Sequence, residues 1–78
     1  MSMVKTKFND PKVPFGERLK EVRIKKGLSQ EELADIAGLD RTYISGCERG
    51  VRNISLVNIY KIADALGIKP SELLPSTK

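Results

Sequence analysis

The side chains best suited to chemistry in this sequence are polar and basic groups between positions 41 and 45. Arg41 is long enough to meet O6 and N7 of a guanine with two hydrogen bonds, and Thr42 offers a hydroxyl and a methyl group suited to thymine. Tyr43 and Ser45 could contact bases or phosphates, with packing of the aromatic ring over a turn as the alternative for Tyr43. The alternative for Arg41 and Thr42 is a solvated first turn of a helix without a ligand. These residue types predict recognition by hydrogen bonding, not the breaking of covalent bonds.

The rest of the residue inventory argues against an enzyme. The chain has no histidine and one cysteine, so it can assemble neither a zinc site nor a Ser-His or Cys-His nucleophile pair. Its 78 residues suit one small domain with little room for a large enclosed active site. Catalysis by carboxylates or lysines alone stays open by residue type, but no arrangement in the sequence supports it. We therefore expect no catalytic residues, no metal and no cofactor.

Composition also predicts the cellular compartment of the protein. A lone cysteine cannot form an internal disulfide framework, which agrees with a reducing compartment. No apolar run approaches the roughly 18 residues of a membrane span, and the first residues lack the apolar core of a secretory signal. We expect a cytoplasmic protein. Its formal net charge of +4 and sequence pI of about 9.4 favour an anionic partner.

Five helices are expected around one core, between a flexible N-terminal arm over residues 1–14 and a tail over residues 75–78. The first helix starts at Phe15, where apolar residues take up helical spacing, and ends near Gly27. Ser29 and Glu32 have the form of a capping box that starts a second helix over about 30–37. The later helices span about 41–49, 56–66 and 68–74, each bounded by a capping residue, a glycine or a proline. The sequence predicts a compact all-α domain over residues 15–74.

The second and third helices have the pattern of a helix-turn-helix. The three residues between them include Gly38, where the turn needs a positive φ, and Asp40, which can cap the third helix. Ala34 is small enough for the third helix to cross close to it, and Ile44 is the apolar side chain that fixes the crossing. A helix held in this way can enter the major groove of DNA with its N-terminal residues leading.

These features resemble the lambda-repressor-like, XRE-type helix-turn-helix DNA-binding proteins over roughly Phe15 to Leu74. The segments that carry the resemblance are Gly27-Leu28-Ser29-Gln30-Glu31-Glu32-Leu33-Ala34, Gly38-Leu39, Tyr43-Ile44-Ser45 and Glu48-Arg49-Gly50. Residues 40–46 and 48–55 are also similar to the controller proteins of restriction–modification systems. The resemblance implies a five-helix fold and a homodimer that binds a pseudo-palindromic operator and regulates transcription, in the controller case of its own gene and the endonuclease gene. The two recognition helices would then lie about 34 Å apart, one turn of DNA.

The resemblance also implies contacts with the DNA backbone. Gln30 matches a residue that commonly holds a phosphate in the family, at a helix end whose exposed amides attract anions. Arg52, Asn53 and Ser55 look like a second backbone clamp, in which Arg52 could also reach a base edge. Such contacts set the register on DNA and supply affinity without reading sequence.

Other residues are assigned to architecture and dimerisation. In the family, the residues matching Arg23 and Glu48 form a partly buried ion pair between the first helix and the end of the third, and Cys47 is expected in the core. Some apolar residues exceed what a core of this size requires. They are predicted to form the dimer interface: Val57, Tyr60, Ile68, Leu73 and Leu74. The alternative is that they only close the bottom of the core.

Other functions share parts of this pattern. A phage-type repressor or a DNA-binding antitoxin would use the same DNA chemistry, whereas a helix-turn-helix protein-interaction module would keep the fold without reading DNA. The polar groups of Gln30, Arg41, Thr42 and Arg52 favour DNA, because a pure interaction face would not need them. The expected partners are double-stranded DNA and a second copy of the chain, with RNA polymerase as a further candidate. Neither a membrane nor a small-molecule ligand is expected.

Overall fold

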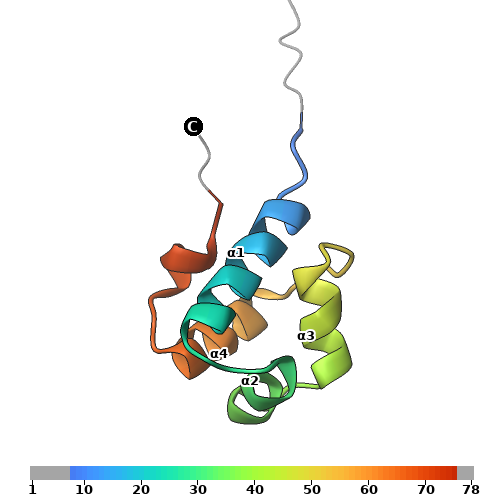
Figure 1. Cartoon of the computed structure of the whole chain (residues 1–78). Helices are drawn as coiled ribbons and strands as arrows, with labels where there is room; N and C mark the ends of the chain where they lie inside the picture. Colours follow the sequence, from blue (N-terminus) through green and yellow to red (C-terminus); the bar gives the residue numbers. More distant parts are fainter. Residues whose placement is uncertain (1–7, 76–78) are drawn as a thin grey trace, which may run out of the picture.

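The computed structural model describes residues 8–75, which form helices and connecting loops without a strand. The elements are α1 (Lys12–Lys25), α2 (Gln30–Ala37), α3 (Arg41–Glu48), α4 (Leu56–Leu66) and a turn of 3-10 helix, η1 (Pro70–Leu73). In Figure 1, α3 lies at one edge of the molecule, with α2 beneath it and the loop that leads to α4 above it. Of these helices, none is long and apolar enough to cross a membrane.

Side-chain caps define where the short helices begin. Ser29 Oγ accepts a hydrogen bond from the Glu32 backbone N–H at 3.0 Å, and the Glu32 carboxylate accepts one from the Ser29 N–H at 2.8 Å, so the predicted capping box is confirmed. Asp40 Oδ1 accepts from the Thr42 N–H at 2.8 Å at the start of α3. Such caps satisfy N–H groups that have no partner within a helix. The caps therefore fix the first residues of α2 and α3. In α3, this start places Arg41 and Thr42 in the exposed first turn.

The turn between α2 and α3 depends on one glycine. Gly38 has φ +71°, a left-handed conformation that other residues rarely adopt. The turn then closes with a hydrogen bond from the Leu39 N–H to the Ala34 carbonyl at 2.8 Å. Ala34 is 2% exposed and Ile44 is fully buried, as the helix-turn-helix pattern predicts. The crossing of α2 and α3 is therefore fixed by a turn and a packed contact together.

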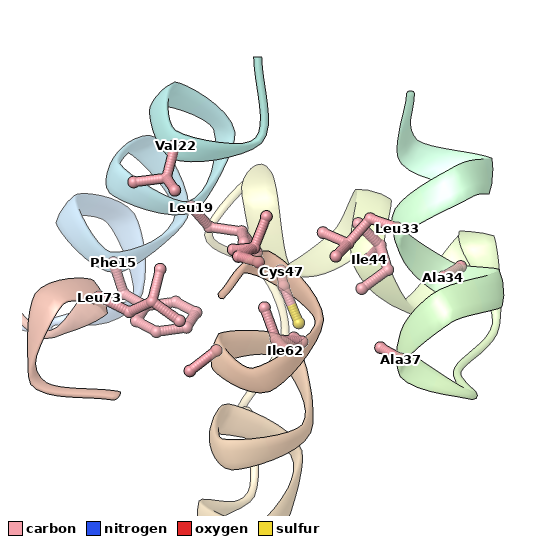
Figure 2. Close-up of a cluster of buried hydrophobic side chains, with 12 residues drawn as sticks. Phe15, Leu19, Val22, Leu33, Ala34, Ala37, Ile44, Cys47, Ile62 and Leu73 are labelled. Atoms are coloured by element: carbon pink, nitrogen blue, oxygen red, sulfur yellow. The ribbon is translucent and has the colours of Figure 1, made fainter. Parts of the chain in front are cut away.

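Every element contributes apolar side chains to a single core, most of which Figure 2 labels. The members are Phe15, Leu19, Val22, Leu33, Ala34, Ala37, Ile44, Cys47, Ile62, Ala63, Leu66 and Leu73. Full burial of one leucine or isoleucine stabilises a fold by about 1.5–3 kcal/mol, so this cluster is the main source of stability. Gly16 brings α1 against the end of α3, because a Cβ there would overlap the carbonyl oxygens of Cys47 and Glu48.

The structure corrects two expected boundaries. The segment after α4 is one turn of 3-10 helix, so the described residues contain four α-helices and not five. Pro70 and Pro75 leave only four residues for η1, and Leu74 is extended because it precedes a proline. Helix α1 begins at Lys12, three residues before the expected Phe15, since a proline is tolerated in the first turn, where N–H groups have no helical partner. Residues 1–7 of the expected arm and 76–78 of the expected tail lie outside the described residues.

Candidate nucleic-acid interface

The outward face of α3 carries the side chains predicted to read bases. Ile44 and Cys47 point into the core, whereas Arg41 and Thr42 are exposed and Ser45 is half-buried. Within residues 8–75, the side chains of Arg41, Thr42 and Ser45 have no hydrogen bond or ion pair. Their donors and acceptors are therefore available to a ligand that approaches the start of α3.

Tyr43 points away from this open face and packs toward α4. Its ring is half-buried against the core, and its hydroxyl accepts a hydrogen bond from Asn58 Nδ2 at 3.1 Å. This geometry matches the alternative considered for Tyr43, an aromatic ring that packs within the fold. The ring and its hydroxyl are therefore part of the structure that holds α3 against α4.

The loop between α3 and α4 brings one of its predicted clamp residues onto α3. Arg52 Cζ lies 5.1 Å from the centroid of the Tyr43 ring, which is within the range of a cation–π interaction. Asn53 and Ser55 are exposed, and Ser55 Oγ accepts a hydrogen bond from the Asn58 backbone N–H at 3.1 Å. Ser55 thus caps α4, while Arg52 joins Arg41 and Thr42 around α3.

Gln30 lies in a polar network with the expected ion pair of Arg23 and Glu48. Arg23 donates from Nε to Glu48 Oε2 at 2.5 Å, from Nη2 to Oε1 at 3.0 Å and from Nη1 to the Leu28 carbonyl at 2.8 Å. Gln30 Nε2 also donates to Glu48 Oε1 at 3.0 Å. The carboxylate therefore connects α1, α2 and α3, and the amide expected to hold a phosphate is oriented by the pair.

The Arg23–Glu48 pair is deeply buried for charged groups, with Arg23 8% and Glu48 9% exposed. Hydrogen bonding to Glu48 raises the pKa of the Arg23 guanidinium above its ordinary value, against the opposing effect of burial. Among the described residues, no buried side-chain nitrogen or oxygen lacks a hydrogen-bond partner. The pair thus has the satisfied geometry that makes a buried charge tolerable.

The residues of the predicted dimer interface differ in their exposure in the structure. Val57 and Tyr60 are exposed on α4, where they line a shallow depression with Leu56, Lys61 and Asp64. Leu74 is 50% exposed and Ile68 is half-buried. Leu73 is fully buried in the core of its own chain, so its assignment to the interface was wrong. An apolar residue near the chain end gives the same sequence signal whether it packs inward or outward.

Sequence reasoning missed two residues that shape this region. Asn58 binds the Tyr43 hydroxyl, and Gly46 lies beneath the Arg52 side chain. A signal for Gly46 was present, because an isolated glycine inside a helix usually has a packing reason. For Asn58 the signal was weak, since a polar residue in the first turn of a helix is ordinary. The exposed Arg49, which follows α3, was also given no role.

Comparison with known proteins agrees with this geometry. The model of the Helix-turn-helix family, HTH_3, matches residues 19–73. Control protein C.BamHI of Bacillus amyloliquefaciens is 49% identical over 70 residues, which cover 88% of this chain and 86% of that protein. The restriction-modification controller protein C.AhdI from Aeromonas hydrophila has a solved structure with a TM-score of 0.79 and 63% sequence identity, covering 80% of this chain and 94% of that one.

A third similar protein has been solved with its ligand. The structure of SinR, the master regulator for biofilm formation, was solved in complex with DNA. It has a TM-score of 0.73 and 35% sequence identity, covering 76% of this chain and 95% of that one. The chain belongs to the helix-turn-helix family, as an XRE-type transcriptional regulator. Within that family it is similar to the controller proteins of restriction–modification systems.

Proposed function

We propose that this chain acts as a homodimer that binds a pseudo-palindromic DNA operator and controls transcription within a restriction–modification system. The observation that carries the proposal is the start of α3, where the exposed side chains of Arg41 and Thr42 have no hydrogen bond or ion pair within residues 8–75. Two such side chains at the leading end of a helix suit hydrogen bonding to base edges in a major groove.

The division of labour among the polar residues follows from their positions. Arg41, Thr42 and Ser45 read bases, while Gln30 and the loop residues Arg52, Asn53 and Ser55 contact the backbone. The start of α2 supports the backbone role of Gln30, because free N–H groups and the helix dipole favour a phosphate there. Tyr43 positions the helix and contacts a base or phosphate through its hydroxyl group. SinR, which has been solved in complex with DNA, supports DNA as the ligand.

Dimerisation is proposed because of how a helix-turn-helix reads a symmetric operator. One helix-turn-helix covers one half-site, so a pseudo-palindromic operator needs two chains whose α3 helices lie about 34 Å apart. Exposed Val57 and Tyr60 on α4 support a self-complementary apolar contact. Ile68 and Leu74 line two other depressions of the surface, so they support the same contact less directly. A two-fold interface uses the same patch on both chains.

Footprinting of the DNA that flanks the gene tests this function. We expect protection of an inverted repeat at moderate salt. The variant Arg41→Ala should lose about 1–3 kcal/mol of discrimination at one guanine in each half-site, because a bidentate contact is removed. Lys20→Ala, which removes an exposed charge from α1, is the matched control and should bind as the wild type does. Absence of a protected repeat, together with an Arg41→Ala variant that behaves like wild type, would overturn the proposal.

A further inference from the structure

The stem of Arg52 crosses α3 at the one residue of that helix that has no side chain. A Cβ placed on Gly46 would lie 2.7 Å from Cγ of Arg52, 3.6 Å from its Nε and 3.7 Å from its Cβ. Gly46 is nevertheless buried, since the Arg52 stem covers it. The Val51 N–H also donates to the Gly46 carbonyl at 3.1 Å, which fixes the loop beside the glycine. The Arg52 stem thus packs on the surface of α3 where position 46 has no side chain. We call this packing site, which Gly46 and the Tyr43 ring form, the seat of Arg52.

An aromatic ring forms the other wall of this seat. Tyr43 lies one helical turn before Gly46, and the Arg52 guanidinium carbon is 5.1 Å from its ring centroid. The ring is held from α4, because Asn58 Nδ2 donates to the Tyr43 hydroxyl at 3.1 Å. Asn58 is itself fixed, with its backbone N–H bonded to Ser55 Oγ at 3.1 Å. Four residues from α3, α4 and the loop between them therefore determine the position of one arginine.

The guanidinium that this seat holds is exposed and free to bind. Within residues 8–75, Arg52 takes part in no hydrogen bond and no ion pair. A guanidinium has five N–H donors in a fixed planar fork, which matches two acceptors on a guanine or a phosphate. Binding a mobile arginine costs conformational entropy, and a stem already held against the protein reduces that cost.

We propose that Gly46 and Asn58 are positioning residues for DNA recognition, which act by holding the Arg52 side chain against α3 and the Tyr43 ring. The inference rests on the proposed function, since it assigns a mechanism to one contact of the same interface. Gly46 supplies the space for the arginine stem, and Asn58 fixes the ring against which the guanidinium lies. Neither residue touches DNA in this mechanism.

The variant Gly46→Ala separates this role from stability. Alanine is the better helix former, so the melting temperature should stay unchanged or rise, while the added methyl group displaces Arg52. The probe is a DNA duplex selected by the wild-type chain from a random pool. We expect Gly46→Ala to lower affinity for it by about ten-fold, as Arg52→Ala does, and to reduce the slope of log affinity against log salt by about 1.

A double-mutant cycle provides the matched control. In the Arg52→Ala background, Gly46→Ala should have no further effect on affinity, because there is no longer a side chain to displace. Asn58→Ala should lower affinity by about three-fold, the scale of one hydrogen bond, and should add nothing when Tyr43→Phe has already removed the acceptor. Circular dichroism and thermal unfolding monitor the fold of each variant.

The outcomes distinguish the inference from the function on which it rests. If no sequence is enriched from the pool by the wild-type chain, the proposed function fails. If a sequence is enriched and Arg52→Ala weakens binding, but Gly46→Ala has no effect or adds fully to Arg52→Ala, the positioning role is overturned and DNA reading stands. Equal losses of DNA affinity for Gly46→Ala, Arg52→Ala and the double variant support the positioning role of Gly46.

Discussion

Two arginines lie against α3, and the fold holds them in contrasting ways. Arg23 is 8% exposed and donates three hydrogen bonds, two to Glu48 and one to the Leu28 carbonyl. Arg52 is exposed, rests on Gly46 and the Tyr43 ring, and has no acceptor within residues 8–75. The same residue type is therefore structural where protein acceptors surround its guanidinium and available to a ligand where only its stem and face are held.

The variant Glu48→Ala removes the buried partner of Arg23 and should cause the largest loss of stability. It leaves the Arg23 charge buried without a counter-ion, and the free energy of unfolding should fall by about 3–5 kcal/mol, the usual cost of removing one partner of a buried pair. Chemical denaturation measures this change. Glu17→Ala, at an exposed carboxylate of α1, is the control and should alter stability by less than about 0.5 kcal/mol. A similar small loss for Glu48→Ala would show that Arg23 reaches water.

The same arginine-to-lysine exchange at both sites sharpens the comparison. Arg23→Lys cannot keep all three hydrogen bonds, so we expect unfolding free energy to fall by about 2 kcal/mol. Arg52→Lys keeps the charge and should leave stability within about 0.5 kcal/mol of wild type. It should also preserve the salt dependence of DNA binding, while it weakens binding to a similar degree at specific and non-specific sites, because the planar fork is lost from a phosphate contact. Denaturation and titration with DNA at several salt concentrations measure the two effects. Comparable stability losses at both positions would contradict the contrast.

Much of the fold could be predicted from local features of the sequence. Ser29, Gly38 and Asp40 specify helix ends through hydrogen bonds and dihedral angles within a few residues, so the caps and the turn could be predicted from the sequence. The start of α1 could not, because Pro14 fits equally before a helix or within its first turn. Likewise, η1 is too short for its spacing to distinguish a 3-10 turn from an α-helix.

The site was predictable only in part, for a physical reason. Exposure of Arg41 and Thr42 follows from the period of α3, once Ile44 and Cys47 face the core. The seat of Arg52 depends on Gly46 and Asn58, which come together through tertiary packing. Leu73 shows the same limit, because its direction depends on where η1 lies against α4 and not on the residues beside it.

Gln30→Ala tests the connection between the two regions. Loss of the hydrogen bond to Glu48 should lower the free energy of unfolding by about 1 kcal/mol, because the Arg23–Glu48 pair itself remains. The variant should also weaken DNA binding to a similar degree at specific and non-specific sites, since a phosphate contact reads no sequence. Denaturation and competition titrations measure these two quantities. A change in base preference would show instead that Gln30 reads a base.

Cys47, beneath both regions, gives the smallest expected effect. Burial raises the pKa of its thiol above the ordinary value of 9.0, and the neighbouring Tyr43 and Arg52 offset part of that rise. The unfolded chain therefore loses this proton at lower pH than the folded chain does. The stabilising contribution is complete below the unfolded pKa and declines as pH rises toward the folded pKa.

Comparison of wild type with Cys47→Ala isolates this titration, because the tyrosines and lysines are common to both chains. In measurements from neutral pH to about pH 10, the stability difference should be constant at neutral pH and should shrink as pH rises past the ordinary thiol pKa of 9.0, since only the wild type loses the thiol contribution. Denaturation across this range measures the difference. A difference that is flat across the range would mean that the thiol ionises alike in both states, which is incompatible with a side chain that is 1% exposed on the inner face of α3.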